Sequence, residues 1–137
     1  MSLSTVIPRS TKYCSAVENI VKTLGHATNQ QIHAELCRLY PKVSMTTVHR
    51  ITTRLFLRGI ISQAPTTSDG SLRYDANIVE HDHFVCAQCG GIRDVSIAED
   101  VTRVLNKALD GCKVTGRVVV FGTCHSCGSV EKKKGKK

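Results

Sequence analysis

Four cysteines in two pairs constrain this chain more than any other feature of its sequence. Each pair has the spacing Cys-x-x-Cys-Gly, first at Cys86 and Cys89 and again at Cys124 and Cys127. Two such knuckles supply four thiolates, the ligand number that zinc takes in a closed tetrahedral site. We therefore predict one structural Zn²⁺ that joins the two pairs. Because its coordination shell is filled, a catalytic role for this ion is not expected.

The other three cysteines, Cys14, Cys37 and Cys112, occur in apolar-periodic or strand-like stretches. Free cysteine usually packs as a small hydrophobic residue, so all three are predicted to be buried. Cysteines at metal-ligand spacing favour a reducing compartment over a secreted disulfide framework. Since the sequence has neither a membrane-length apolar run nor a signal-like N-terminus, we expect a cytoplasmic protein without a membrane partner.

The formal net charge of +8 is distributed unevenly over the 137 residues. Residues 1–75 carry nine Lys/Arg against four Asp/Glu, residues 76–131 carry five against seven, and the remaining stretch to residue 137 adds five lysines. A basic first half favours contact with nucleic acid. The lysine-rich tail, residues 131–137, is predicted to be disordered.

Three apolar-periodic stretches in the basic half predict three short helices. The expected N-cap and stop are Ser15 and Gly25 for the first helix, Thr28 and Pro41 for the second, and Ser44 and Gly59 for the third. Ser15 also has capping-box spacing to Glu18. Residues 60–64 and 72–75 then read as two strands around a turn. Helix–helix–helix–hairpin is the order of a winged helix-turn-helix, which we predict for residues 1–76 and in which the third helix enters the DNA major groove.

The third of these helices has a polar face beside its apolar stripe of Val48, Ile51 and Leu55. Hydroxyl and guanidinium groups on that face suit phosphates and base edges. The candidate DNA-binding residues are Thr46, Thr47, His49, Arg50, Thr53 and Arg54, with Arg50 foremost. A plain solvated helix face would look the same, but the basic half, the helix order and the hairpin together favour DNA.

Residues 77–130 predict a small α/β domain. Strands are expected over 81–86 and 90–95, a helix around 101–109, and a last strand that includes Val114 and residues 118–121. So small a sheet would leave a valine-rich edge exposed, and pairing with a second copy would cover it. We therefore expect a homodimer. The fold class predicted for the whole chain is α+β, a winged helix-turn-helix followed by an α/β dimerisation domain with a four-cysteine zinc site.

Three runs of residues carry a resemblance to a known family. They are His81-Asp82-His83-Phe84-Val85-Cys86-Ala87-Gln88-Cys89-Gly90, Gly122-Thr123-Cys124-His125-Ser126-Cys127 and Ser44-Met45-Thr46-Thr47-Val48-His49-Arg50. From about Arg9 to Gly128 the chain resembles the ferric uptake regulator (Fur) family. The resemblance implies a metal-dependent transcriptional repressor that is not an enzyme. Such a protein would bind double-stranded operator DNA as a homodimer when Fe²⁺ or Mn²⁺ is bound, with no small-molecule substrate besides metal ions.

The resemblance also implies a regulatory metal site between the two domains. Matched position by position, its ligands would be His26, Asp75, His81, His83 and Asp94. Spacing alone singles out only His81 and His83. Histidine and carboxylate suit iron, manganese, zinc and nickel alike. Aspartate at position 94, where iron regulators commonly have glutamate, resembles the peroxide-sensing subgroup, in which iron-dependent oxidation of His26 or His81 would release the repressor from DNA.

The chain departs from the family pattern at three places. His49 stands where tyrosine is usual in the recognition helix, and residues 11–14 replace the usual Thr-Pro-x-Arg, so that a leading DNA-contacting element would be missing. Residues 113–117 lack the histidine of a further metal site, which we therefore expect to be absent despite Asp82.

Alternative functions remain open from the sequence. One is a zinc- or nickel-responsive regulator of the same family, although no cysteine precedes the paired histidines as in zinc-sensing relatives. Another is a metalloenzyme that uses the His/Asp cluster, although the sequence offers no candidate for the general base that it would need. The third is a zinc-ribbon module that binds protein or RNA instead of duplex DNA.

Overall fold

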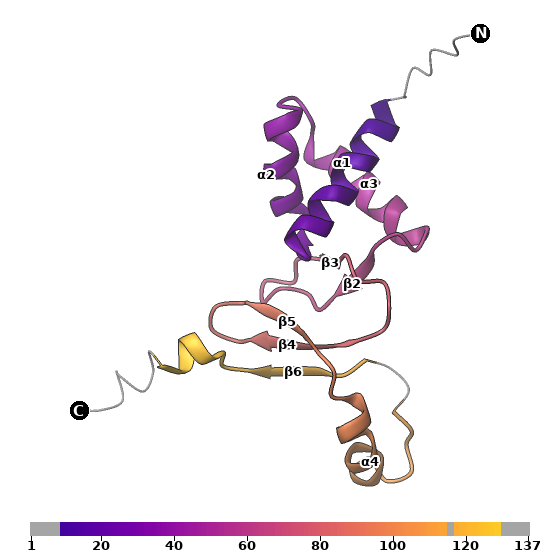
Figure 1. Cartoon of the computed structure of the whole chain (residues 1–137), viewed down its shortest axis with the longest axis vertical. Helices are drawn as coiled ribbons and strands as arrows, with labels where there is room; N and C mark the ends of the chain where they lie inside the picture. The colour runs from indigo at the N-terminus through magenta and orange to yellow at the C-terminus, as the bar shows by residue number, and fades with distance from the viewer. Residues whose placement is uncertain (1–8, 115–116, 130–137) are drawn as a thin grey trace. The chain divides into compact units, whose positions relative to one another are not determined.

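The computed structural model describes residues 9–114 and 117–129. The chain divides into two compact units, residues 1–78 and residues 79–137, which we call the N-terminal and the C-terminal unit. The elements of the N-terminal unit are α1 (Arg9–Leu24), β1 (His26–Thr28), α2 (Asn29–Leu39), α3 (Met45–Leu57), β2 (Ser62–Ala64) and β3 (Arg73–Asp75) (Figure 1). Those of the C-terminal unit are β4 (Asp82–Cys86), β5 (Ile92–Val95), α4 (Ala98–Ala108) and β6 (Val119–Gly122). None of the described helices combines the length and apolar character that crossing a membrane requires.

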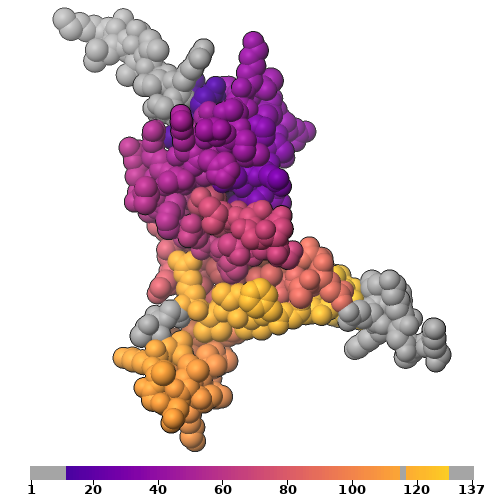
Figure 2. Space-filling model, turned by 180° about the vertical axis from the view of Figure 1, so that it is seen from behind, coloured from indigo at the N-terminus to yellow at the C-terminus, as the bar shows by residue number. Residues whose placement is uncertain are grey.

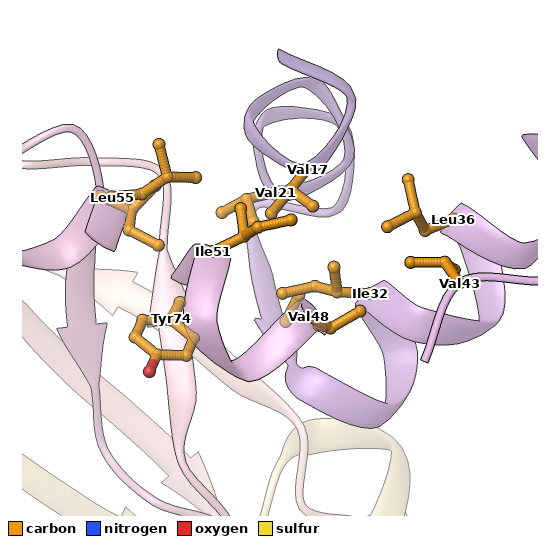
Figure 3. Close-up of a cluster of buried hydrophobic side chains, with 11 residues drawn as sticks. Val17, Val21, Ile32, Leu36, Val43, Val48, Ile51, Leu55 and Tyr74 are labelled. Carbon is orange, nitrogen blue, oxygen red and sulfur yellow. The ribbon is translucent and has the colours of Figure 1, made fainter. Parts of the chain in front are cut away.

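A single apolar core holds the N-terminal unit together (Figure 3). Each of α1, α2 and α3 turns one stripe of side chains toward it, and β3 adds Tyr74. In α3 the stripe is Val48, Ile51 and Leu55, of which none is more than 5% exposed. Burial stabilises the fold by about 1.5–3 kcal/mol for each such side chain. Because this stripe points inward, the polar face of α3 is turned to solvent.

Caps set the ends of α2 and α3 where the sequence predicts them. Thr28 accepts the backbone N–H of Gln31, whose side chain in turn accepts the backbone N–H of Thr28, a complete capping box. Ser44 accepts the N–H of Thr47 at 3.1 Å and begins α3. Gly59 follows the end of α3 with φ of 71°, a left-handed conformation that glycine adopts without strain.

The first helix begins earlier than predicted. It starts at Arg9, so Ser15 lies inside α1 and is not its cap. A contact with a distant part of the chain supports the additional turns, since Tyr13 packs edge-on against Tyr40 with ring centroids 4.9 Å apart. Cys14 also packs against the core. Tertiary packing therefore outweighs the local capping signal, which is weaker than such contacts.

A three-stranded antiparallel sheet in the order β1-β3-β2 completes the N-terminal unit. The hairpin of β2 and β3 agrees with the prediction, but β1 was not predicted. It sets His26 opposite Asp75 and Thr28 opposite Arg73. A strand of three residues between two helices is too short to show alternation in sequence. Its consequence is that His26 is held directly beside Asp75.

The C-terminal unit contains a sheet in the order β5-β4-β6. The central strand pairs antiparallel with β5, with His83 opposite Asp94, and parallel with β6, with Cys86 opposite Gly122. Parallel neighbours need a crossover connection, and here the connection contains α4. Val114, predicted as part of the last strand, lies outside β6. The parallel pairing brings the end of β6 beside the end of β4.

Apolar side chains of the C-terminal unit stay exposed in the single chain. No residue of α4 is buried, and Val104 on this helix is 65% exposed. Phe121 on β6 is 66% exposed. Figure 1 shows α4 standing away from the sheet, and in Figure 2 the yellow chain around residue 120 lies at the visible surface. A contiguous exposed apolar surface would suit an interaction face.

The three cysteines outside the pairs differ in their surroundings. Cys14 and Cys37 are half-buried and pack against the core of the N-terminal unit. Cys112 is exposed, so its predicted burial was wrong. It follows Asp110 and Gly111, which both have positive φ, in the turn after α4. The predicted tail, residues 131–137, lies outside the described residues.

Candidate metal centres

The four paired cysteines converge in the C-terminal unit. The Sγ atoms of Cys86, Cys89, Cys124 and Cys127 all lie within 4.8 Å of one another, and those of Cys89 and Cys124 are 3.8 Å apart. Tetrahedral zinc with Zn–S bonds of about 2.3 Å places its sulfur ligands about 3.8 Å apart. The pairing of β4 with β6 makes this convergence, because each strand leads directly into one knuckle.

Backbone N–H groups surround the thiols. Cys124 donates its N–H to Sγ of Cys86 at 3.3 Å, and Gly91 donates to Sγ of Cys89 at 3.4 Å. Hydrogen bonds from the backbone at Cys89 and Cys124 lower the pKa of the Cys86 thiol to about 6. Hydrogen bonding with the thiol of Cys124, followed by burial, raises the pKa of Cys127 to about 12. Four thiols this close ionise together only if a cation balances their charge, so the donor set fits a structural zinc ion.

In the N-terminal unit, a histidine and a carboxylate form the first of two polar groups with metal-ligand chemistry. His26 Nε2 lies 3.2 Å from Oδ2 of Asp75, on neighbouring strands β1 and β3. The carboxylate is only 2% exposed, and its other oxygen accepts the N–H of Asn77 at 2.8 Å. The strand pairing and this second bond hold the carboxylate in place for a cation.

In the C-terminal unit, two histidines share one carboxylate oxygen. Oδ1 of Asp94 lies 3.0 Å from Nε2 of His81 and 3.3 Å from Nε2 of His83. The two imidazole rings are tilted against each other with centroids 4.4 Å apart. His81 Nδ1 lies 2.6 Å from the carbonyl oxygen of Val79. A carbonyl oxygen only accepts, so Nδ1 carries the proton and Nε2 is left as the ligand atom.

This geometry favours either a metal ion or a second ring proton beside Asp94. If Nδ1 of His81 donates to Val79 and the ring is neutral, the lone pair on Nε2 points at the carboxylate oxygen of Asp94. The lone pair and the negative oxygen repel each other. A second proton on the ring or a metal ion beside Asp94 removes the repulsion. Imidazole nitrogen and carboxylate oxygen are the ligands of iron, manganese, zinc and nickel sites. The sequence drew attention to His81 and His83, but gave no sign of the Val79 carbonyl that orients His81.

Asp82, between these two histidines, has a different task. Its carboxylate accepts the N–H groups of Ile97 at 3.1 Å, Ala98 at 2.8 Å and Val118 at 2.9 Å. These hydrogen bonds, that from Val118 above all, lower the pKa of Asp82. Asp82 therefore joins β4 to the beginning of α4 and to the residue before β6.

The polar face of α3 is exposed as its pattern predicts. Thr46, His49, Arg50, Thr53 and Arg54 are exposed, and Thr47 is half-buried. The hydroxyl of Thr47 lies 2.9 Å from that of Ser44, so it belongs partly to the cap of the helix. Sequence reasoning missed one polar residue behind this face, Asn29, which is 6% exposed and hydrogen-bonds to His49.

Comparison with known proteins agrees with this arrangement. The model of the ferric uptake regulator family matches residues 9–121. The peroxide-responsive repressor PerR of Staphylococcus aureus is 27% identical over 110 residues, which are 79% of this chain and 74% of that protein. The Campylobacter jejuni peroxide stress regulator superposes with a TM-score of 0.66 at 25% identity, over 87% of this chain and 91% of that one. The Helicobacter pylori ferric uptake regulator has a TM-score of 0.70 at 22% identity, over 85% and 80%.

The fold and these matches define a class, the metal-dependent transcriptional regulators. Within it, the chain belongs to the ferric uptake regulator family. Proteins of this family bind DNA, typically as dimers, and are not enzymes. The metalloenzyme alternative is therefore wrong. The second cysteine pair follows the last residue that the family model matches.

Proposed function

We propose that this chain is a repressor that binds operator DNA as a homodimer when Fe²⁺ or Mn²⁺ occupies a regulatory site. The observation that carries the proposal is the single Asp94 oxygen that faces the Nε2 atoms of both His81 and His83. With neutral imidazoles such a group is unfavourable unless a metal ion is bound, and its ligands are ones that both ions accept. A structural zinc ion held by the four cysteines accompanies it.

The regulatory ligands come from both units of the chain. His26 and Asp75 belong to the N-terminal unit, whereas His81, His83 and Asp94 belong to the C-terminal unit. Ligands from both units bind one ion only in a subset of the arrangements that the two units adopt. Binding therefore shifts the population toward that subset. Because linkage is reciprocal, DNA that prefers the same subset strengthens metal binding by the same factor.

The DNA-binding part of the proposal rests on α3. Arg50 and Arg54 are exposed on its polar face, away from the buried stripe. Guanidinium groups in such a position bind phosphates or the O6 and N7 atoms of guanine. Thr46, Thr53 and His49 add shorter polar groups along the same face.

Homodimer formation is supported by the exposed apolar residues of the C-terminal unit. Val104 on α4 and Phe121 on β6 are each about two-thirds exposed in the single chain, at 65% and 66%. A second copy of the chain would cover both. Two α3 helices in a dimer can then bind successive major grooves, which lie about 34–36 Å apart.

Peroxide sensing is a narrower form of this function. It is supported by the peroxide-responsive relatives and by Asp94 in the ligand set. Ferrous iron supplies the reducing electron for peroxide when it is bound. The side chains of His26 and His81 are 15% and 12% exposed, against 1% for His83, so we propose that oxidation falls on the first two. Mass spectrometry of iron-loaded protein after mild peroxide would detect the added oxygen; unmodified peptides would exclude peroxide sensing.

Fluorescence anisotropy tests the main proposal. Labelled random-sequence duplexes and single strands are titrated with protein in the presence and absence of Mn²⁺ or, anaerobically, Fe²⁺. We expect duplex binding that increases with metal. Duplex binding that is absent or independent of metal would contradict the repressor, and preference for single strands would favour a different nucleic-acid-binding role.

A further inference from the structure

The exposed histidine of α3 is attached to a buried side chain. Nδ1 of His49 lies 3.0 Å from Nδ2 of Asn29, the first residue of α2. Asn29 is only 6% exposed, whereas His49 is turned to solvent. One ring nitrogen of His49 is thus occupied from the inside of the protein, and the other is left to face outward.

A second contact orients the amide of Asn29. The hydroxyl of Thr52, which is fully buried, lies 2.9 Å from Oδ1 of Asn29, and it shares its single proton between this oxygen and the carbonyl oxygens of Val48 at 3.1 Å and His49 at 3.2 Å. With its oxygen directed at Thr52, the amide turns its NH₂ group toward His49. An NH₂ group only donates, so Nδ1 of His49 must accept. A neutral imidazole that accepts at Nδ1 carries its proton on Nε2.

We propose that Asn29 is a positioning residue that holds His49 as the Nε2–H tautomer, so that His49 offers DNA a hydrogen-bond donor. The inference rests on the proposed function. In the major groove, guanine presents two acceptors, N7 and O6, whereas cytosine presents a donor, N4–H₂. His49 therefore favours guanine over cytosine at the base that it faces.

The surroundings of His49 suit a base reader. Beside its ring lies a hollow of about 210 Å³, bounded by the beginnings of α2 and α3 and by Ser71 and Leu72, which precede β3. His49 is therefore located where the two helices of the motif and the wing meet. A donor held in this position reads a base without first losing the freedom of a mobile side chain.

Nitrogen NMR tests the tautomer without DNA. Long-range ¹H–¹⁵N spectra of the zinc-loaded dimer, labelled at histidine, distinguish a protonated ring nitrogen from a bare one. The His49→Gln variant identifies the signals. We expect a bare Nδ1 and a protonated Nε2 in the wild type, and the reverse in Asn29→Asp, whose carboxylate accepts from Nδ1–H. A wild-type Nδ1 that is protonated, or that exchanges between both forms, would overturn the proposal.

Selection of binding sequences from random duplexes with Mn²⁺ tests the reading of a base. We expect a guanine in each half-site that the wild type prefers over cytosine by about fivefold to tenfold, as one hydrogen bond allows. His49→Ala and Asn29→Asp should lose this preference. Asn19→Asp, the same substitution at an exposed position of α1 outside this hollow, should keep it. Circular dichroism checks that each variant is folded. If Asn29→Asp is unfolded, the ¹H–¹⁵N spectrum of the wild type alone decides the tautomer of His49.

The two hypotheses fail in different ways. Wild-type protein that binds DNA with the same base preferences as His49→Ala would overturn the inference and leave the repressor intact. Wild-type protein that binds no duplex at all would overturn the proposed function and His49 as a base reader together.

Discussion

The carboxylate of Asp82 accepts the backbone N–H of Ala98 at 2.8 Å, so a residue of β4 caps α4. The helix has no cap of its own, since the N-cap residue Ile97 makes no side-chain hydrogen bond. A negative charge at this position also interacts favourably with the helix dipole. The same carboxylate accepts the N–H of Val118, so one side chain of β4 is bonded both to the beginning of α4 and to the residue before β6.

Asp82→Ala should therefore destabilise the C-terminal unit. The change leaves three N–H groups without their acceptor, and we expect the free energy of unfolding to fall by roughly 2–3 kcal/mol. Urea unfolding at a fixed protein concentration measures it, because the stability of a dimer depends on concentration. Glu99→Ala, an exposed change in the first turn of α4, is the control. Equal stability of the two variants would show that the cap contributes little.

Cys86→Ser should remove zinc and stability together. The variant lacks one of the four converging thiols, and a structural zinc site contributes its binding energy to folding. We expect less than one zinc ion per chain and a loss of several kcal/mol of folding free energy, measured by elemental analysis and thermal unfolding. Cys112→Ser serves as the control because this thiol is exposed and outside the cluster. A zinc-replete, stable Cys86→Ser protein would rule out the cluster as the zinc site.

His83→Ala should keep zinc but lose the response to the regulatory metal. It removes one of the proposed ligand atoms. Loss of an outer-shell partner lowers metal affinity by about 10- to 100-fold, so for a direct ligand we expect a loss of about 100-fold or more. Anisotropy titrations with Mn²⁺ at fixed duplex concentration measure the loss. His125→Ala, an exposed histidine of the second knuckle, should respond like the wild type. If Mn²⁺ still stimulates His83→Ala, this residue is not a regulatory ligand.

Arg50→Ala should weaken duplex binding by about 1–3 kcal/mol. The guanidinium lies on the exposed face of α3, where it can bind a phosphate or a guanine. Arg38→Ala removes the same charge from the end of α2, where Arg38 pairs with Glu35 at 3.5 Å. Comparing the two at several salt concentrations separates a specific contact from general attraction. Equal losses would leave only a non-specific contribution from Arg50.

Val104→Lys should shift the protein toward monomers. It places a charge on the exposed apolar side of α4, where a partner would have to desolvate it. Sedimentation velocity over a range of concentrations measures the change in dimer dissociation. Leu57→Lys is the matched control, since Leu57 is 76% exposed but belongs to the N-terminal unit. Unchanged dimers in Val104→Lys would exclude this face of α4 from the interface.

Patterns of local origin could be predicted from the sequence. Thr28 and Ser44 cap their helices as expected, because a cap depends on residues three positions apart. The cysteine pairs could be found for the same reason, since each knuckle is a short local turn. Once the zinc site was assumed, the two ends of the C-terminal unit had to meet. The family resemblance then supplied the remaining candidate ligands.

Features that depend on distant contacts could not be predicted in this way. β1 exists because it pairs with β3, and nothing in residues 26–28 alone indicates a strand. The early start of α1 depends on Tyr13 meeting Tyr40. The bond from Asn29 to His49 crosses between two helices, and its partners are 20 residues apart. Each is a consequence of packing, which spacing within one segment does not reveal.

The parallel pairing of β6 with β4 also bears on how the protein is made. During synthesis the N-terminal unit, with the whole of α3, emerges from the ribosome before Cys124 and Cys127 are added. Chains that stop in between contain the proposed DNA-reading face but neither the four-thiol cluster nor the strand that leads to it. The thiol cluster therefore closes only after almost the whole chain has been made, because it needs residues from both ends of the C-terminal unit.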